Sequence, residues 1–117
     1  MSNKAKYLFI ASMDIDADKE ELFDEVYDSE HVPLIMNVPG VISARRYVTE
    51  PLTIVIGGEK KAITAKGEPR HTAVYELESA DVLTSPAWAA AVDGGRWPKE
   101  VRPFTRNRHH VLKKLKE

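Results

Sequence analysis

The sequence predicts an α+β fold, and two observations lead to this prediction. Stretches typical of strands and stretches typical of helices alternate along all 117 residues, with no repeat, low-complexity stretch or linker between them. The chain is also 43% hydrophobic and 30% charged, a composition typical of one globular domain, which we expect to span residues 1–117. A chain of this length buries one core but encloses no deep pocket far from every edge, so a large site would need a second copy.

The first part of the chain is expected to form a strand and then a broken helix. The apolar and aromatic run Tyr7–Met13 is bounded by polar residues and is typical of a strand. A helix is predicted to begin near Asp18, where acidic residues have capping-box spacing. Pro33 lacks an amide donor and would clash with the preceding turn. The helix should therefore bend or restart around Asp28–Val32, and a Pro-Gly pair ends it.

The rest of the chain is expected to supply three strands, a hairpin and a second helix. Strand composition is found at Val41–Thr49, His71–Glu78 and Pro103–Leu112. Ser85-Pro86 places a capping hydroxyl before a proline and predicts the start of a helix. Residues 53–65 contain two β-prone stretches around a Gly-Gly turn and are expected to form an inserted β-hairpin, with a mobile loop as the alternative.

This order of elements predicts a ferredoxin-like βαββαβ arrangement with a four-stranded antiparallel sheet and an inserted hairpin. Two helices can cover only one face of such a sheet. In the first strand, however, Leu8 and Ile10 point to one side while Tyr7 and Phe9 point to the other, so both faces are apolar. We therefore expect a homodimer that forms by sheet-to-sheet packing.

Charge and composition exclude several classes of function. The 17 Lys and Arg against 18 Asp and Glu leave a net charge of -1, and alternation scatters the basic residues of the last strand over both faces, so we expect no nucleic-acid partner. The apolar run near the N-terminus is too short for a signal peptide or a membrane span, so no membrane partner is expected. The absence of cysteine permits a reducing compartment, and we expect a cytoplasmic protein.

Metal and cofactor sites are not expected either. The sequence has no cysteine ligands, and no two of its four histidines have the spacing of a zinc pair on a helix. The Gly-Gly turn of the hairpin lacks the further glycines and the helix that a nucleotide-binding loop needs.

The most unusual local cluster is Tyr27–Pro33, which puts a phenol, two carboxylates and an imidazole where a proline disturbs the helix. The unperturbed pKa of histidine lies near neutrality, so His31 is a candidate proton-transfer residue, with Glu30 or Asp28 orienting it. The Tyr27 ring is a candidate substrate contact. In the alternative interpretation, these residues only cap and solvate the end of a broken helix.

Three further residues are candidates for substrate binding. Arg45 and Arg46 point to opposite faces of their strand, so one of them must face a buried or shared surface. Arg46 and Tyr75 are candidates to bind a substrate oxyanion, whereas cross-strand pairing of the arginine with Glu76, or with an acid across the dimer, is the alternative. Trp97 is a candidate for the edge of a cleft, with packing against the sheet as the alternative.

The segments Tyr27–Leu34, Val38–Val41, Arg45–Tyr47 and Ser85–Trp88 resemble the EthD-like branch of the dimeric α+β barrel superfamily, in order over about residues 5–112. The resemblance implies a ferredoxin-like subunit in a barrel-like dimer, with a cleft for small cyclic or aromatic ligands between the sheet and the first helix. It implies activities such as lactone isomerisation, polyketide cyclisation and cofactor-free oxygenation. By position, the family's helix-one histidine corresponds to His31. The inserted hairpin and the basic stretch after Pro103 depart from the family pattern.

Two functions are therefore open. The first is a small cofactor-independent enzyme that acts by proton transfer on an oxygenated cyclic or aromatic molecule. The second is a non-catalytic dimeric binding or accessory protein, since a shared fold does not fix a function. The position of His31 relative to a cavity separates the two.

Overall fold

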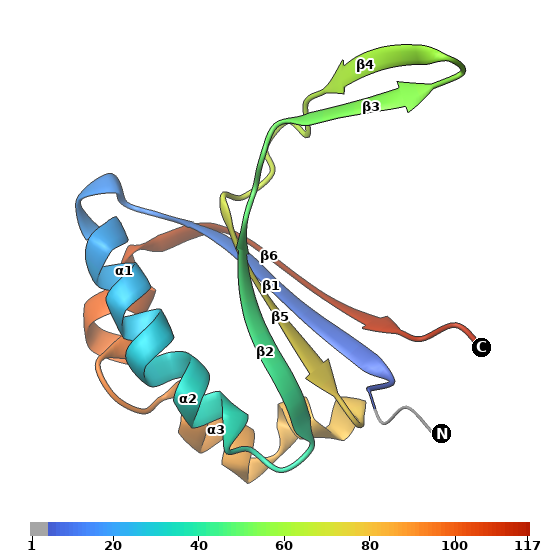
Figure 1. The fold of residues 1–117 in the computed structure, drawn as a ribbon. Helices are drawn as coiled ribbons and strands as arrows, with labels where there is room; N and C mark the ends of the chain where they lie inside the picture. Colours follow the sequence, from blue (N-terminus) through green and yellow to red (C-terminus); the bar gives the residue numbers. More distant parts are fainter. Residues whose placement is uncertain (1–4) are drawn as a thin grey trace.

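The computed structural model describes residues 5–117 and has the predicted α+β architecture (Figure 1). Four antiparallel strands form one sheet in the order β2-β5-β1-β6, and the helices lie on one face of it. These strands are β1 (Tyr7–Ile15), β2 (Val41–Val48), β5 (His71–Leu77) and β6 (Thr105–Lys114). The ferredoxin-like arrangement is confirmed.

The first helical region changes type where the sequence predicts a break. It consists of a 3₁₀ turn η1 (Ala17–Lys19), the helix α1 (Glu20–Val26), a π turn η2 (Tyr27–His31) and the helix α2 (Val32–Met36). In the π turn, the N–H of Val32 donates to the carbonyl of Tyr27, five residues back. Pro33 has no N–H, and its ring would clash with the carbonyl four residues back in a regular helix. The wider turn accommodates the proline without ending the helical path.

A second helical region lies beside the first. It consists of η3 (Ala80–Thr84), α3 (Pro86–Val92), η4 (Trp97–Val101) and η5 (Arg102–Phe104). The predicted start of α3 is confirmed, because the hydroxyl of Ser85 accepts a hydrogen bond from the N–H of Trp88 at 3.1 Å. The segments η3 and η4 are not predicted from the sequence. The π turn η4 again contains a proline, Pro98.

The inserted hairpin is confirmed, and the loop alternative is wrong. Strands β3 (Leu52–Ile56) and β4 (Glu59–Ile63) pair with each other in a separate sheet that projects beyond the main sheet (Figure 1). Gly57 and Gly58 have φ values of 61° and 82°, and positive φ at both central residues is what a type I′ hairpin turn requires. The hairpin gives the chain a radius of gyration of 16.1 Å, compared with about 13 Å expected for a compact domain of this length.

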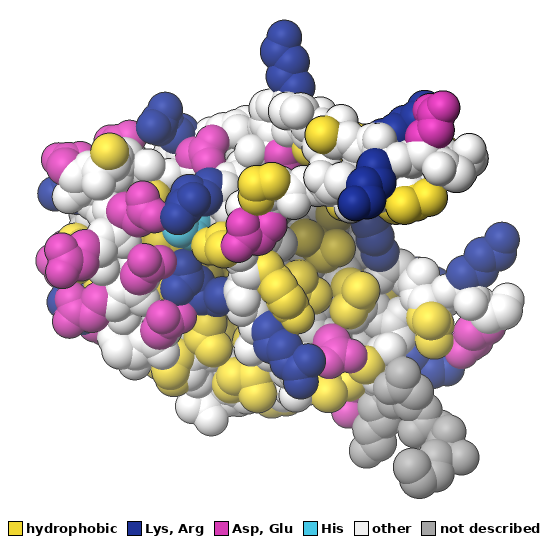
Figure 2. Space-filling view, turned by 45° about the horizontal axis from the view of Figure 1, so that its top comes forward, with side chains coloured by type: hydrophobic (Ala, Val, Ile, Leu, Met, Phe, Trp, Pro, Cys, Tyr) yellow, Lys and Arg dark blue, Asp and Glu magenta, His cyan; other side chains and the backbone are white. Residues whose placement is uncertain are grey.

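The core lies between the helices and one face of the sheet. Its largest fully buried side chains are Tyr75, Phe23, Ile35, Leu77, Val26 and Val101. On the opposite face, the apolar side chains are only half-buried within one chain; they are Leu8, Ile10, Val74 and Val111. Figure 2 shows hydrophobic side chains gathered in the hollow between the projecting hairpin and the main sheet.

A β-bulge interrupts the last strand. Ser12 pairs with His109 but Asp14 pairs with Arg106, so β6 has one more residue than β1 at this point. Asn107 has a positive φ of 50°, and its side-chain amide donates to the Asp14 carboxylate at 2.9 Å. The bulge changes which side chains of β6 face the helices. None of the helices within residues 5–117 has the length and apolar character that crossing a bilayer requires.

Candidate functional site

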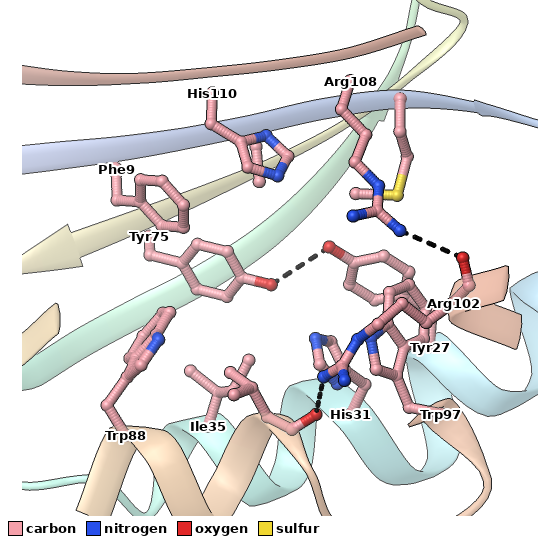
Figure 3. Close-up of a pocket in the computed structure, with 13 residues that line it drawn as sticks. Phe9, Tyr27, His31, Ile35, Tyr75, Trp88, Trp97, Arg102, Arg108 and His110 are labelled. Atoms are coloured by element: carbon pink, nitrogen blue, oxygen red, sulfur yellow. Dashed lines mark hydrogen bonds between the residues drawn. The ribbon is translucent and has the colours of Figure 1, made fainter. Parts of the chain in front are cut away.

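A cavity of about 200 Å³ lies between the inner face of the sheet and the helices (Figure 3). Its wall is largely aromatic, with contributions from Phe9, Tyr27, Tyr75, Trp88 and Trp97. The side chains that bring charge or an imidazole to it are His31, His110, Arg102 and Arg108. A small apolar cavity with a few convergent polar groups is typical of a ligand site.

His31 lies in this cavity and is neutral. It is only 5% exposed, and its imidazole stacks on the indole of Trp97 with the ring centroids 4.2 Å apart. Its Nδ1 atom is buried and has no hydrogen-bond partner. Burial lowers the pKa of His31 to about 4, and the nearby positive charge of Arg102 acts in the same direction. At neutral pH, an uncharged imidazole therefore lines the cavity.

Two tyrosines place a pair of hydroxyls beside His31. The hydroxyls of Tyr27 and Tyr75 are 3.1 Å apart, and both rings are buried. Burial raises the pKa of both phenols, so both remain protonated. One of their two protons forms the bond between them. The other has no acceptor among the described residues and is available to an oxygen atom of a ligand.

Two arginines come from the region after η4. Arg102 donates to the Asp93 carboxylate and to the Val92 carbonyl, both at 2.8 Å. Arg108 donates to the hydroxyl of Thr105 at 2.9 Å and to the carbonyl of Arg102 at 3.0 Å. Neither residue was predicted as a site residue, because alternation along a strand does not show which of its two faces the helices cover.

The cavity brings together four of the seven predicted site residues: Tyr27, His31, Tyr75 and Trp97. The other three do not line it: Asp28, Glu30 and Arg46. The expectation that a cleft forms between the sheet and the first helix agrees with this placement.

The expected hydrogen bond from Glu30 to His31 is not formed. Glu30 instead accepts from the backbone N–H of Arg96 at 2.9 Å and from the guanidinium of the same residue. These bonds lower the pKa of Glu30. Neighbouring residues in a helical turn point in different directions, so Glu30 reaches Arg96 while His31 stacks on Trp97 and lines the cavity. The carboxylate therefore fixes the segment that carries Trp97, on which His31 stacks.

Asp28 and Arg46 lie in a separate surface groove. The Arg46 guanidinium donates to Asp28 at 2.9 Å and to Asp24 at 2.8 Å, and it covers the Tyr27 ring at 4.7 Å from the ring centroid. Asp28 therefore orients Arg46 and not His31. The alternative pairing of Arg46 with Glu76 is not formed either, since that carboxylate accepts from a serine hydroxyl on the same strand as the arginine. With its charge already paired, Arg46 is poorly placed to bind a substrate oxyanion in the aromatic cavity.

No cluster of three or more histidine, aspartate or glutamate side chains within residues 5–117 has the arrangement of a metal site.

Fold and cavity together define the class of this chain: it is a ferredoxin-like α+β protein with a cavity between the sheet and the helices. No protein-family model matches the sequence, and a comparison with curated proteins finds no significant match.

Solved structures share the fold. One is an ethyl tert-butyl ether D (EthD) family protein from Bacillus halodurans, with a TM-score of 0.58, 15% identity, and coverage of 95% of this chain and 99% of that chain. Another is the heme-degrader MhuD from Mycobacterium tuberculosis with two hemes bound in its active site, with a TM-score of 0.55, 18% identity, and coverage of 93% and 94%. A variant of MhuD with two manganese protoporphyrin IX molecules per active site gives a TM-score of 0.58, 16% identity and 93% coverage of both chains. At these identities, the comparison establishes the fold alone.

Proposed function

We propose that this protein is a small cofactor-independent enzyme that acts by proton transfer on an oxygenated cyclic or aromatic molecule, in the manner of an isomerase, a cyclase or a monooxygenase. One observation carries the proposal. A neutral histidine lines an aromatic cavity next to a hydroxyl pair with one free proton. A base and a hydrogen-bond donor in one cavity are what abstraction of a proton next to a carbonyl needs.

In this mechanism, His31 removes a proton from the carbon next to a carbonyl group of the ligand. The C–H bond breaks, its electron pair moves toward the carbonyl oxygen, and the proton goes to the imidazole. The free proton of the Tyr27–Tyr75 pair is donated in a hydrogen bond to the oxygen, which becomes more negative. Return of the proton from His31 to another atom of the ligand gives an isomer and restores the neutral base.

The size of the cavity indicates the size of the ligand. About 200 Å³ is below the range of roughly 300–1,000 Å³ that is typical of sites for drug-sized ligands. A single ring with a few substituents fits this volume better than a porphyrin, the kind of molecule that the solved structures of MhuD contain. We therefore infer a small cyclic or aromatic ligand, and no resident cofactor is needed for the step described above.

A non-catalytic binding protein is the second candidate, and one observation favours it. A catalytic histidine is commonly oriented by a hydrogen bond to its second nitrogen. In this protein, Nδ1 of His31 has no such partner, and stacking on Trp97 holds the ring instead.

We also infer a homodimer of cytoplasmic location with a single-domain subunit. The apolar outer face of the sheet is half-exposed in one chain, and the hairpin adds exposed apolar side chains; they are Leu52, Ile54, Val55, Ile56 and Ile63. An apolar surface of this extent is typical of a protein interface. The sheet of a second copy is the simplest cover for it, since such a contact is self-complementary.

The experiment that tests catalysis is a turnover screen with lactones, hydroxylated aromatics and polyketide-like ketones. His31→Gln is compared with His109→Gln, which changes an exposed histidine on the outer face of β6. Turnover lost in His31→Gln and retained in His109→Gln, with both variants folded, supports the enzyme. Equal turnover in both variants ends the role given to His31. Ligand binding without turnover of any compound supports the binding protein.

A further inference from the structure

The side chains around the aromatic cavity include cations but no carboxylate. Two of the described residues that line it are arginines, Arg102 and Arg108, and none is aspartate or glutamate. The charge of Arg102 is balanced by Asp93 at 2.8 Å. Arg108 forms no ion pair with any residue in the described range 5–117. Among the described residues, the cavity therefore has one cation, the exposed Arg108, whose charge no ion pair compensates.

Neutral oxygen atoms hold this cation in place. The Thr105 hydroxyl accepts from Nε of Arg108 at 2.9 Å, and the Arg102 carbonyl accepts from Nη2 at 3.0 Å. The Thr105 hydroxyl is itself fixed, because it donates to the same carbonyl at 2.7 Å. These bonds orient the guanidinium but leave its charge unpaired, and Nη1 has no acceptor among the described residues. A fixed, uncompensated guanidinium is a typical binding group for a carboxylate.

Because of the bulge in β6, Arg108 lines the cavity and Arg106 does not. Strict alternation would place Arg106, Arg108 and His110 on the same face of the sheet. Because of the extra residue at Asn107, Arg106 pairs in register with Asp14 on the outer face, and it reaches Asp16 at 3.3 Å. Bulges are common next to active sites, where they redirect a side chain.

We infer that the ligand is a small ring compound that carries a carboxylate, with the carboxylate bound by Arg108 and the ring packed among the cavity's aromatic side chains. This inference rests on the proposed function for its choice of cavity, and it deepens that function by naming the substrate class. Arg108, Tyr75 and His31 line the same cavity, so one small ligand can contact all three (Figure 3).

The test is a binding measurement with pairs of compounds that differ only in charge. Benzoate, salicylate and cyclohexanecarboxylate are each compared with the corresponding neutral amide, at neutral pH and physiological salt. Trp88 and Trp97 line the cavity and provide a fluorescence signal. Arg108→Gln is compared with Arg106→Gln, which removes the same charge from the same strand outside the cavity. Circular dichroism establishes that both variants are folded.

We expect at least one carboxylate to bind at millimolar concentration or below, and its amide to bind about tenfold more weakly. Arg108→Gln should weaken carboxylate binding about tenfold and leave amide binding unchanged, whereas Arg106→Gln should change neither. The inference is overturned if no carboxylate binds, if each amide binds as well as its acid, or if the two variants lose the same affinity.

His31→Gln separates this inference from the proposed catalysis. The variant should bind the carboxylate within about twofold of the unmodified protein, because the anion contacts Arg108. Preference for carboxylates without turnover of any compound would overturn the catalytic role of His31 but not the ligand class. Turnover that depends on His31 without any preference for anions would overturn the ligand class but not the catalytic role of His31.

Discussion

His31 owes its properties to its surroundings and not to an acidic partner. Trp97 stacks on its ring, and the Tyr27 ring is roughly perpendicular to it with the two ring centroids 5.0 Å apart. The charge that acts on it is the cation of Arg102. Burial among these rings and the positive charge of Arg102 both disfavour imidazolium. The residue is therefore a base that stays available well below neutral pH.

The low pKa of His31 predicts a pH dependence of stability. In the unfolded chain its pKa is near 6.5, and in the folded protein it is about 4. Above pH 6.5 the ring is neutral in both states. Between pH 6.5 and pH 4, the unfolded chain binds a proton that the folded protein does not, so the free energy of unfolding falls as the pH falls, by about 3 kcal/mol in total.

Urea unfolding near pH 7 and near pH 4.5 measures this effect in the unmodified protein and in His31→Gln. The variant should lose less stability on acidification, because it lacks the group that titrates. Burial also lowers the pKa of His71, which contributes in the same direction to both proteins and cancels in the comparison. Equal losses of stability in the two proteins would contradict the assignment.

The hydroxyl pair predicts an effect of Tyr75→Phe on stability and turnover. The substitution removes the 3.1 Å hydrogen bond to Tyr27, so the free energy of unfolding should fall by about 1 kcal/mol. Turnover of any substrate should fall by about tenfold, because Tyr27 keeps a free proton but loses the second hydroxyl that orients and polarises it. Tyr47→Phe, at a half-exposed position of β2 away from this cavity, is the control and should change neither quantity. Unchanged turnover in Tyr75→Phe would argue against an oxyanion at this hydroxyl.

The sequence predicted part of this site for identifiable reasons. A histidine and a tyrosine beside a helix-breaking proline are visible in one segment, so Tyr27 and His31 could be found. Their neighbours could not be assigned correctly, because a π turn changes the direction of each side chain relative to a regular helix. Glu30 therefore faces Arg96, and Asp28 faces Arg46.

At the scale of elements, the site is formed where two π turns meet. The turns η2 and η4 contact each other through the stacked rings of His31 and Trp97 and through the bonds from Arg96 to Glu30. Gly95 has a positive φ of 66°, and a Cβ atom there would collide with the Glu30 carboxylate. The chain can therefore approach η2 closely only with glycine at this position.

This contact predicts that Glu30→Gln loosens η4. The amide keeps the size of the side chain but loses the charge that strengthens its bonds to Arg96, so η4 should open more often. Hydrogen exchange of the backbone amides of residues 99–102 should become faster than in the unmodified protein. Glu25→Gln is the control, since Glu25 is more exposed and lies 3.7 Å from the same guanidinium. The same exchange rates in both variants would mean that Glu30 does not hold the turn.

The elements themselves differ in how well the sequence predicts them. The four main strands, the hairpin and the break at Pro33 follow from alternation, a Gly-Gly turn and a proline. The π turn at Pro98 and the bulge at Asn107 do not follow, because each depends on a tertiary contact: the first on Glu30, the second on Asp14. Because of this bulge, the sequence could not show that Arg106 leaves the face that Arg108 and His110 share.

At the scale of the whole molecule, the chain is a thin slab with one uncovered face. Its principal dimensions are 49 × 45 × 19 Å, which correspond to one layer of sheet and one layer of helices. The face opposite the helices has an apolar centre and a projecting hairpin with apolar side chains. Packing of a second sheet would add a third and a fourth layer and bury this centre.

The proposed dimer predicts that Val74→Lys shifts the protein to a monomer. Val74 lies on the outer face of β5, and a lysine there would place an unpaired charge between two sheets. The dimer dissociation constant should rise by about 100-fold or more, as measured by sedimentation equilibrium. Ala90→Lys adds the same charge to an exposed position of α3 and should leave the dimer intact. A monomer in the unmodified protein at micromolar concentration would contradict the proposal.

The π turn η2 also makes the site sensitive to the number of residues in the chain. A π turn holds one residue more than a turn of regular helix, and each residue rotates a helix by roughly 100°. Deleting Ser29 would remove the extra residue of this turn and swing α2 around its axis relative to α1. Either His31 or the apolar face of α1 would then turn away from the sheet, so both could no longer be buried against it. The position of His31 thus depends on the number of residues between Val26 and Pro33. A single deletion in this segment would displace the imidazole from the cavity, whereas substitution of a neighbouring residue would leave the number of residues unchanged.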